Sequence, residues 1–214
     1  MKSFQPASTA PTPRPRTTVL LVRHAATDTM SCRLTGRDAA VPLNALGEQQ
    51  AEALAGAVAR VSVDAIYSSP LARACATAAP LAASRHLPIH IEEDLTEINF
   101  GEWTGLTFET LSRRPEWQAY NAARSGSHIP GGETAAAACA RIGAALSRFH
   151  LRHPGGTVAA FTHAELVRYA VLLARRQPLD RWAEIDVPPA SIAVLECDAS
   201  GVRELTGARF AIPA

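Results

Sequence analysis

Three polar segments that follow short apolar runs carry the residues of this chain best suited to chemistry on an anion. Each run has the length and composition of a buried strand. The runs are Val19–Val22, Ala65–Tyr67 and Thr157–Ala160. The first leads directly into Arg23 and His24, the second is followed by Arg73, and the third by His163. If the three strands are parallel neighbours, their carboxyl ends place these four side chains in one cationic pocket.

The elements around these segments alternate between strands and helices. The predicted strands cover residues 18–22, 64–67, 89–91, 157–161, 191–196 and 202–205, of which the last two form a hairpin. The predicted helices cover residues 45–60, after an Asn44 N-cap, and residues 70–84. Short helical pieces are predicted within residues 107–123, interrupted at Pro115. The longest helix is opened by Gly131–Thr134 and ends near residue 152, and a last helix covers residues 164–175. Pro80 predicts a kink or an early end of the second helix. The alternation predicts an α/β fold, a three-layer α/β/α sandwich with a mainly parallel central sheet.

Composition and length are those of an ordinary globular protein. The chain has 214 residues, 47% hydrophobic and 19% charged, and we expect residues 17–214 to form a single domain. Residues 1–16 are rich in proline, Ser and Thr and cannot bury enough apolar surface to order, which predicts a disordered tail. A net charge of +1 provides no bulk field for nucleic acid or an anionic membrane, so any anion site must be local. The sequence carries no signal for oligomeric state.

The spacing of the cysteines and the lack of long apolar segments indicate the cellular compartment of the protein. Cys32, Cys75, Cys139 and Cys197 are far apart and form no C-x-x-C pair, which is typical of reduced thiols rather than of a disulfide framework or a zinc site. We find no apolar signal segment near residue 1 and no run approaching the ~20 apolar residues of a membrane helix. We therefore expect a cytoplasmic protein that is neither exported nor inserted into a membrane.

Taken together, the motifs resemble those of the histidine phosphatase superfamily, which has the phosphoglycerate-mutase-like fold. The matching stretches are Leu21–His24, Pro42–Ala51, Ser68–Ala74 with Thr77 and Ala78, Glu97–Gly105, Pro130–Thr134 and Thr162–His163. They follow one another in the family's order from about residue 19 to the closing hairpin. The residues after Glu97, Ile98-Asn99-Phe100-Gly101-Glu102-Trp103, are closer to the phosphatase branch than to the mutases.

The resemblance implies a phosphomonoester hydrolase that needs no metal and no cofactor and acts on a small phosphorylated metabolite. Neutral His24 would attack the phosphorus and form a phosphohistidine intermediate. Arg23, Arg73 and His163 would bind the non-bridging oxygens, and their positive charge would favour the neutral form of His24. Glu97 has the family position of the acid that protonates the leaving alkoxide and then takes a proton from the attacking water.

Several positions depart from the family pattern. Ala25 stands where glycine is usual, which costs on the order of 1 kcal/mol if that backbone needs a positive φ. Met30 falls where many members have an asparagine that touches phosphate, and Thr27 is a candidate replacement donor. Glu165, two residues after His163, is expected to point away from the phosphate or to select a substrate with a positive group.

Two alternatives to a phosphatase follow from these observations. One is a phosphoglycerate-mutase-type phosphotransferase on the same fold. The other is a phospho-ligand-binding protein that has lost most of its catalysis, which the departures at Ala25, Met30 and Glu165 would explain. Because the nucleophile, the three phosphate-binding residues and the acid are all retained, the phosphatase is the favoured interpretation.

Overall fold

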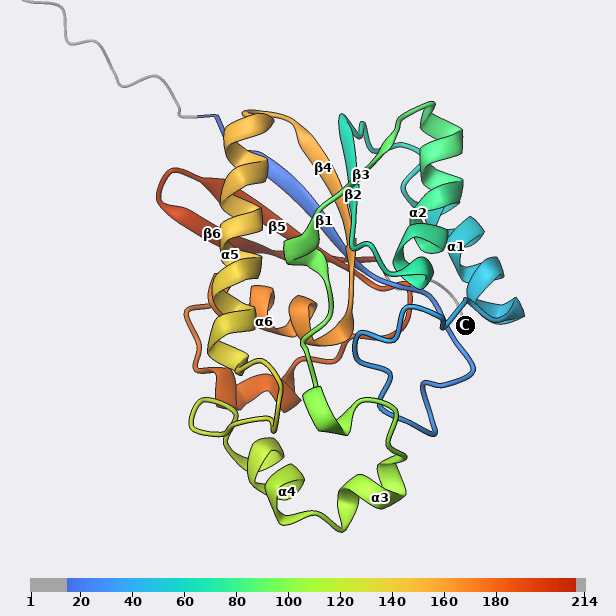
Figure 1. Ribbon diagram of the computed structural model, residues 1–214. Helices are drawn as coiled ribbons and strands as arrows, with labels where there is room; N and C mark the ends of the chain where they lie inside the picture. The colour runs from blue at the N-terminus through green and yellow to red at the C-terminus, as the bar shows by residue number, and fades with distance from the viewer. Residues whose placement is uncertain (1–14, 211–214) are drawn as a thin grey trace, which may run out of the picture.

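A mixed sheet of six strands forms the centre of the molecule (Figure 1). The computed structural model describes residues 15–210, with side chains through residue 205. Of the predicted tail, residues 1–16, only residues 15 and 16 are among the described residues. The strands are β1 (Thr17–Arg23), β2 (Ala65–Ser68), β3 (Ile89–Ile91), β4 (Thr157–Thr162), β5 (Ile192–Asp198) and β6 (Gly201–Phe210). Their order across the sheet is β3-β2-β4-β1-β5-β6.

Parallel pairing dominates the sheet and brings the three functional strand ends together. β1 pairs with β4, β4 with β2 and β2 with β3 in parallel, whereas β5 pairs antiparallel with β1 and β6 antiparallel with β5. The register aligns Arg23 with Thr162, and Ser68 with Phe161. The carboxyl ends of β1, β2 and β4 therefore meet at one edge of the sheet. The mainly parallel sheet and the closing hairpin are both confirmed.

Helices cover both faces of this sheet (Figure 1). They are α1 (Ala45–Ala57) and α2 (Ala72–Arg85) on one face, and α5 (Ala135–Arg152) and α6 (Ala164–Ala174) on the other. Each face buries its own apolar cluster, with Leu54 and Leu81 in one, and Phe149 and Tyr169 in the other. The predicted α/β/α sandwich is thus confirmed, and burial of both sheet faces explains why its strands are continuous apolar runs.

Short helices form a cap at the carboxyl edge of the sheet. They are η1 (Glu93–Leu95), η2 (Gly101–Trp103), α3 (Phe108–Ser112), α4 (Pro115–Ala122) and η3 (Leu179–Glu184). Pro115 is the first residue of α4, which confirms the predicted interruption. Trp103 packs edge-on against Trp117 and Tyr120, with ring centroids 5.4 and 5.5 Å apart. This aromatic contact joins η2 to α4, which lies beyond the ends of the strands (Figure 1).

Two helix ends differ from those predicted. α2 runs to Arg85 with Pro80 inside it. The carbonyl of Ala76, which loses its hydrogen bond donor at Pro80, belongs to an exposed residue and can be solvated. α1 ends at Ala57 rather than at residue 60, because Nη2 of Arg85 donates to the carbonyls of residues 58, 59 and 61 and holds that segment in a turn.

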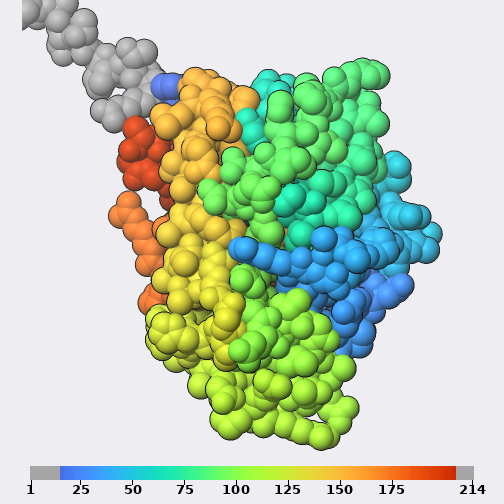
Figure 2. All heavy atoms as spheres, viewed as in Figure 1, coloured from blue at the N-terminus to red at the C-terminus, as the bar shows by residue number. Residues whose placement is uncertain are grey.

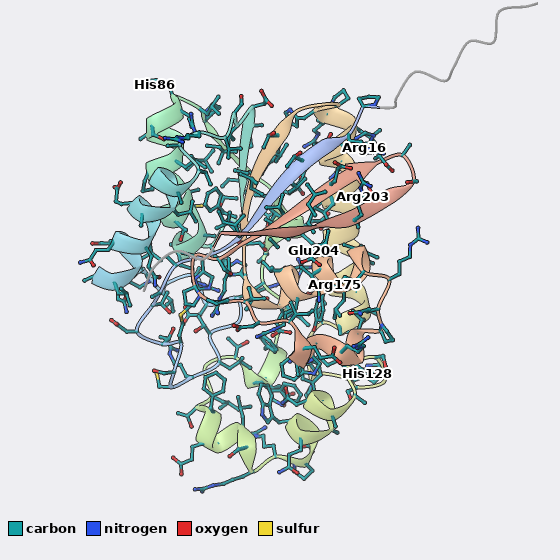
Figure 3. The ribbon with its side chains drawn as sticks, turned by 180° about the vertical axis from the view of Figure 1, so that it is seen from behind. Arg16, His86, His128, Arg175, Arg203 and Glu204 are labelled. Carbon is teal, nitrogen blue, oxygen red and sulfur yellow. The ribbon has the colours of Figure 1, made fainter. Side chains whose placement is uncertain are left out.

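Ion pairs tie the C-terminal hairpin to its neighbours on the outer surface (Figure 3). Arg175, directly after α6, pairs with Glu204 of β6, and its Nη2 lies 3.1 Å from Oε1. Arg16 and Arg203 both pair with Glu196 of β5. β5 is held beside β1 by their antiparallel pairing, and the segment that precedes β5 is bonded to the backbone of Arg23 and His24.

Candidate active site

His24 lies directly after β1 and is held in one tautomer. Its Nδ1 is 2.8 Å from the carbonyl oxygen of Ala25, which can only accept a hydrogen bond. Its Nε2 is 3.3 Å from Nε of Arg73, which can only donate one. The proton of the neutral imidazole is therefore on Nδ1 and the lone pair is on Nε2. Nε2 is thus the atom that can act as a nucleophile.

The surroundings of His24 keep its imidazole neutral. The residue is 7% exposed, and burial lowers its pKa to about 3, with further lowering by the charges of Arg73 and Arg23. A protonated imidazole would have no lone pair with which to attack an electrophile. Because the pKa lies far below neutrality, the lone pair on Nε2 is available throughout the physiological pH range.

Arg73, in the first turn of α2, connects His24 to the loop that follows β1. Its Nη1 donates to the carbonyl of Asp38 at 2.9 Å, and its Nη2 donates to the carbonyl of Gly36 at 2.7 Å. The guanidinium is buried, so its planar fork has one fixed orientation in front of Nε2. Such a fork presents positive charge and N–H donors to any anion that approaches His24.

His163, directly after β4, has a buried nitrogen without a hydrogen bond partner. Its ring centroid is 5.1 Å from that of His24. Its Nε2 is 2.8 Å from Oγ of Ser69. That hydroxyl accepts from the N–H of Leu71 at 3.3 Å and has no acceptor other than Nε2 among the described residues, so we assign its proton to the contact with Nε2. Burial lowers the pKa of His163, so its ring is neutral and its proton is on Nδ1. That Nδ1 has no acceptor among the described residues.

Arg23 brings a second unpaired donor to the same place. Its Nη1 donates to the carbonyl of Val187 at 2.5 Å, whereas its buried Nε has no acceptor within the part of the chain that the structure describes. Burial, followed by the charge of Arg168, lowers the pKa of Arg23 to about 10, so the group stays charged at neutral pH. A buried N–H without an acceptor costs about 1–3 kcal/mol. An anion in this pocket would remove that cost for both Arg23 and His163.

Glu97 lies on the loop between η1 and η2, and its carboxyl group is buried. Its Oε1 accepts from the N–H of Ile98 at 2.9 Å. Burial raises the pKa of this carboxyl group, and the Ile98 N–H and the charges of Arg73, Arg141 and Arg23 oppose the rise. Glu97 therefore keeps its proton to a higher pH than an exposed glutamate would, close to the cationic groups of the pocket.

Three residues that the sequence analysis missed hold the loop of Glu97. Arg37 donates from Nε to the carbonyl of Glu97 at 2.7 Å, and Arg141 donates from Nη1 to the carbonyl of Thr96 at 2.6 Å. Glu133 joins the two arginines, with two contacts to Arg141 of 2.7 and 2.9 Å and one to Arg37 of 3.1 Å. Figure 2 shows the loop after β1, in blue, crossing the surface to reach the yellow segment that contains α5.

The chain matches the model of the histidine phosphatase superfamily (branch 1) over residues 19–207. It belongs to this superfamily. The matched residues include all of the side chains that meet at the carboxyl edge, so the resemblance seen in the motifs extends over the whole of the sandwich.

The chain is similar to two named proteins and to one solved structure. "Bifunctional protein Rv2228c" of Mycobacterium tuberculosis is 31% identical over 187 residues, which are 86% of this chain and 51% of that protein, so the chain spans about half the length of that relative. Phosphoserine phosphatase 1 of Hydrogenobacter thermophilus is 33% identical over 135 residues, covering 61% of this chain and 64% of that protein. The solved structure of Bacillus stearothermophilus YhfR has a TM-score of 0.83 at 27% identity and covers 89% of this chain and 96% of that one.

The first turn of α1 supports the backbone that follows the candidate nucleophile of this member of the histidine phosphatase superfamily. Asn44 caps the helix by accepting from the N–H of Gly47 at 2.9 Å, and its own N–H donates to the carbonyl of Ala26 at 3.1 Å. Oε1 of Gln50 accepts from the N–H of Ala26 at 3.0 Å. Gly47 makes this approach possible, because a Cβ there would lie 2.1 Å from the Ala26 oxygen. These contacts account for the Asn, Gly and Gln of the matching motif.

The structure gives different outcomes for the departure at Ala25 and for Thr27, the candidate replacement donor. Ala25 is not among the residues with positive φ, and its N–H donates to Oγ1 of Thr77 at 3.0 Å, so the condition for a strain cost is not met. Thr27 is buried, and its hydroxyl lies 3.1 Å from that of Thr29, which lies 2.8 Å from that of Thr35. The structure thus joins Thr27 to a chain of hydroxyls, and its contact with phosphate stays a prediction.

Glycines allow two loops to approach closely behind Glu97. At Gly101 φ is +49°, and a Cβ built there would lie 2.1 Å from the carbonyl oxygen of Pro130. A Cβ at Gly132 would lie 2.5 Å from the carbonyl oxygen of Asn99. Residues 131–134, predicted to open the longest helix, lead into α5 at Ala135 and also support the loop that carries Glu97. In the sequence, the Gly131-Gly132-Glu133 motif is the feature that could have indicated this role.

We expect Gly101→Ala to destabilise the folded protein by about 2–4 kcal/mol, since a positive φ and a steric clash both act against the new Cβ. The measurement is the midpoint of thermal unfolding. Gly126→Ala is the matched control, because Gly126 has no positive φ and no heavy atom lies within 4 Å of its Cβ position. Equal midpoints for the two variants would contradict the close approach of the loops.

Metal-ligand clusters and membrane-spanning helices are both absent from the described residues. Within residues 15–205, whose side chains are described, no three or more His, Cys, Asp or Glu side chains are grouped so that they could hold a metal ion. No helix in the described part of the chain is both long enough and apolar enough to cross a bilayer.

Proposed function

We propose that this histidine phosphatase hydrolyses phosphomonoesters of a small metabolite through a phosphohistidine intermediate, without a metal ion or a cofactor. Nε2 of His24 bonds to the phosphorus as the bond to the ester oxygen breaks, and protonated Glu97 gives its proton to the leaving alkoxide. Ionised Glu97 then takes a proton from a water molecule whose oxygen attacks the phosphohistidine. Inorganic phosphate leaves, and both side chains return to their starting protonation states.

The observation that carries this proposal is the pair of buried, unpaired donors beside a nucleophilic nitrogen. Nε of Arg23 and Nδ1 of His163 have no acceptor among the described residues. The ring of His163 is 5.1 Å from that of His24, and the charge of Arg23 acts on the pKa of His24. A phosphoryl group has three non-bridging oxygens, enough to accept from both donors and from Arg73. Because the donors are fixed before the reaction, they would stabilise the charge that develops on those oxygens. This arrangement supports phosphoryl transfer.

The raised pKa of Glu97 supports its role as the proton donor. An ordinary glutamate is almost fully ionised at neutral pH and would have no proton to give. Burial shifts the balance of this carboxyl group toward the protonated form. After the alkoxide has left with the proton, the carboxylate is the base that the second step requires.

The test of this proposal is hydrolysis of p-nitrophenyl phosphate by purified protein in excess chelator. We expect the rate to be the same with and without the chelator. Protein quenched in alkali during turnover should carry bound phosphate. Brief acid treatment should release this phosphate, as expected of phosphohistidine. A rate that falls on chelation and returns with Mg²⁺ would refute the metal independence. No turnover of any member of a broad phosphoester panel would favour the alternative of a phospho-ligand-binding protein.

A further inference from the structure

Glu165 is the centre of a buried ion cluster between α6 and the cap. Its Oε2 pairs with Nη1 of Arg124, and its Oε1 accepts from Nη1 of Arg168 at 2.7 Å. The side chains of Arg124 and Glu165 are only 3% and 9% exposed. Both carboxylate oxygens are thus already engaged by guanidinium groups. These pairs leave no carboxylate oxygen of Glu165 spare for a positive group of a substrate, which argues against the expected selection role. The expected orientation of Glu165 away from the phosphate stays a prediction.

Arg124 neutralises Glu165 from the side of the cap. Its guanidinium is stacked 3.6 Å from the ring centroid of Trp182 and 4.5 Å from that of Tyr120. Nη1 also donates to the hydroxyl of Tyr169 at 3.0 Å. Glu165 therefore faces two guanidinium groups, and Asp186 is a second acid that acts on Arg168. The side chain of Arg168 is 20% exposed and that of Arg124 only 3%, so Arg168 is the member of the cluster that can meet a ligand.

Arg168 lies beside Arg23, at the edge of the pocket. Its Nε donates to the carbonyl of Ile185 at 3.1 Å, while Arg23 donates to the carbonyl of Val187. Ile185 has an extended backbone, with φ −99° and ψ 100°. Carbonyls two residues apart in an extended segment point to the same side about 7 Å apart, so the two guanidinium groups are neighbours.

The charges agree with this placement. Burial lowers the pKa of both Arg23 and Arg168, and among charged groups Arg168 has the largest effect on Arg23, while Glu97 has the largest effect on Arg168. Nη2 of Arg168 donates to no described residue and is not a buried unpaired atom, so it stays accessible. Arg168 therefore has a donor available to a group of the substrate other than the phosphoryl oxygens.

Building on the proposed phosphatase function, we propose that Arg168 binds a second anionic group, such as a carboxylate, on the alcohol part of the substrate. Arg23, Arg73 and His163 suffice for the phosphoryl oxygens, which leaves Nη2 of Arg168 without an acceptor. Because Arg168 and Arg23 hold carbonyls two residues apart, a carboxylate a few bonds from the ester oxygen is the kind of group suited to reach Arg168. Its charge would also offset the repulsion between neighbouring guanidinium groups. The substrate class is therefore a phosphomonoester of a hydroxy acid or a similar anionic alcohol.

The test compares 3-phosphoglycerate with glycerol 3-phosphate, which differ only in a carboxylate against a hydroxymethyl group. We expect kcat/KM of the wild type to favour 3-phosphoglycerate, and Arg168→Gln to reduce this preference by about tenfold or more, as for loss of a charge-assisted hydrogen bond. Arg181→Gln is the matched control, since Arg181 forms an exposed pair with Glu184 three residues away and should leave the preference unchanged.

Inhibition of the wild type provides a measurement that needs no variant. 3-Phosphoglycerate should inhibit hydrolysis of p-nitrophenyl phosphate at concentrations about tenfold below those of glycerol 3-phosphate, by the same charge-assisted contact. Equal inhibition by the two compounds, or an unchanged preference in folded Arg168→Gln, would overturn the role of Arg168 while leaving the phosphatase proposal intact. Failure of the wild type to hydrolyse p-nitrophenyl phosphate would instead refute the proposed function.

Discussion

Replacing His24 with alanine is expected to lower the rate of p-nitrophenyl phosphate hydrolysis by about 10⁴-fold or more, as for loss of other covalent nucleophiles. The physical reason is that Nε2 forms the bond to phosphorus, and neither Arg73 nor any other group in the pocket replaces its lone pair. The unpaired donors of Arg23 and His163 remain, so the variant should still bind inorganic phosphate in a calorimetric titration. The expected result is therefore a protein that binds phosphate but does not turn over.

The control for this variant is His86→Asn. His86 lies at the C-terminal end of α2, far from the carboxyl edge of the sheet (Figure 3), and its φ of 54° is one that asparagine adopts readily. This variant should retain wild-type activity. Turnover by His24→Ala at the wild-type rate would remove His24 from the mechanism. Circular dichroism of both variants checks that the fold is preserved.

Glu97→Gln is expected to lower kcat for an alkyl phosphate such as glycerol 3-phosphate by about 10²–10⁴-fold, the usual contribution of general acid catalysis. Glutamine keeps the shape of the side chain and can still accept from the N–H of Ile98, but it has no proton to give. With p-nitrophenyl phosphate the leaving phenolate needs no proton. Transfer of the phosphoryl group to His24 should then proceed, whereas hydrolysis of the phosphohistidine, which needs Glu97 as a base, should stall. A burst of one p-nitrophenolate per enzyme and accumulation of phosphohistidine are the expected signs.

The pH profile gives a second readout of Glu97. Because its pKa is raised, the carboxyl group is protonated below that value, and kcat/KM for alkyl phosphates should fall as the pH rises through it. Glu97→Gln should lack this alkaline limb. Loss of activity from protonation of His24 should occur only as the pH approaches its pKa of about 3. An alkaline limb that is unchanged in Glu97→Gln would assign it to another group and contradict the proposed role.

The order of the elements and the edge at which the pocket lies could be predicted from local patterns. Apolar runs the length of a strand predicted β1, β2 and β4, and the Asn44 N-cap and Pro115 marked helix starts correctly. These features depend on a few neighbouring residues, whose propensities and side chain contacts act over one turn of helix or one strand. Arg85 shows the limit of such reasoning, because its contacts with residues 58–61 end α1 early.

The contacts that orient the pocket are not local, and sequence reasoning did not find them. Arg37 reaches the carbonyl of Glu97 across 60 positions of the chain, and Arg23 reaches that of Val187 across 164. Most charged residues are solvated, so nothing in the sequence distinguishes Arg37 or Arg141 from a surface arginine. Glu165 is the sharpest case, because the sequence showed only an acid next to a phosphate pocket.

By itself the sequence determined the fold, the superfamily and the set of residues that follow the three strands, since each depends on residue types in a fixed order along the chain. Only the tertiary structure decided the tautomer of His24, the unpaired donors of Arg23 and His163, and the pairing of Glu165 with Arg124 and Arg168. The reason is that protonation and hydrogen bonding depend on burial and on the partners that packing brings together. Those partners come from segments that meet only when the sheet, its helices and the cap have assembled.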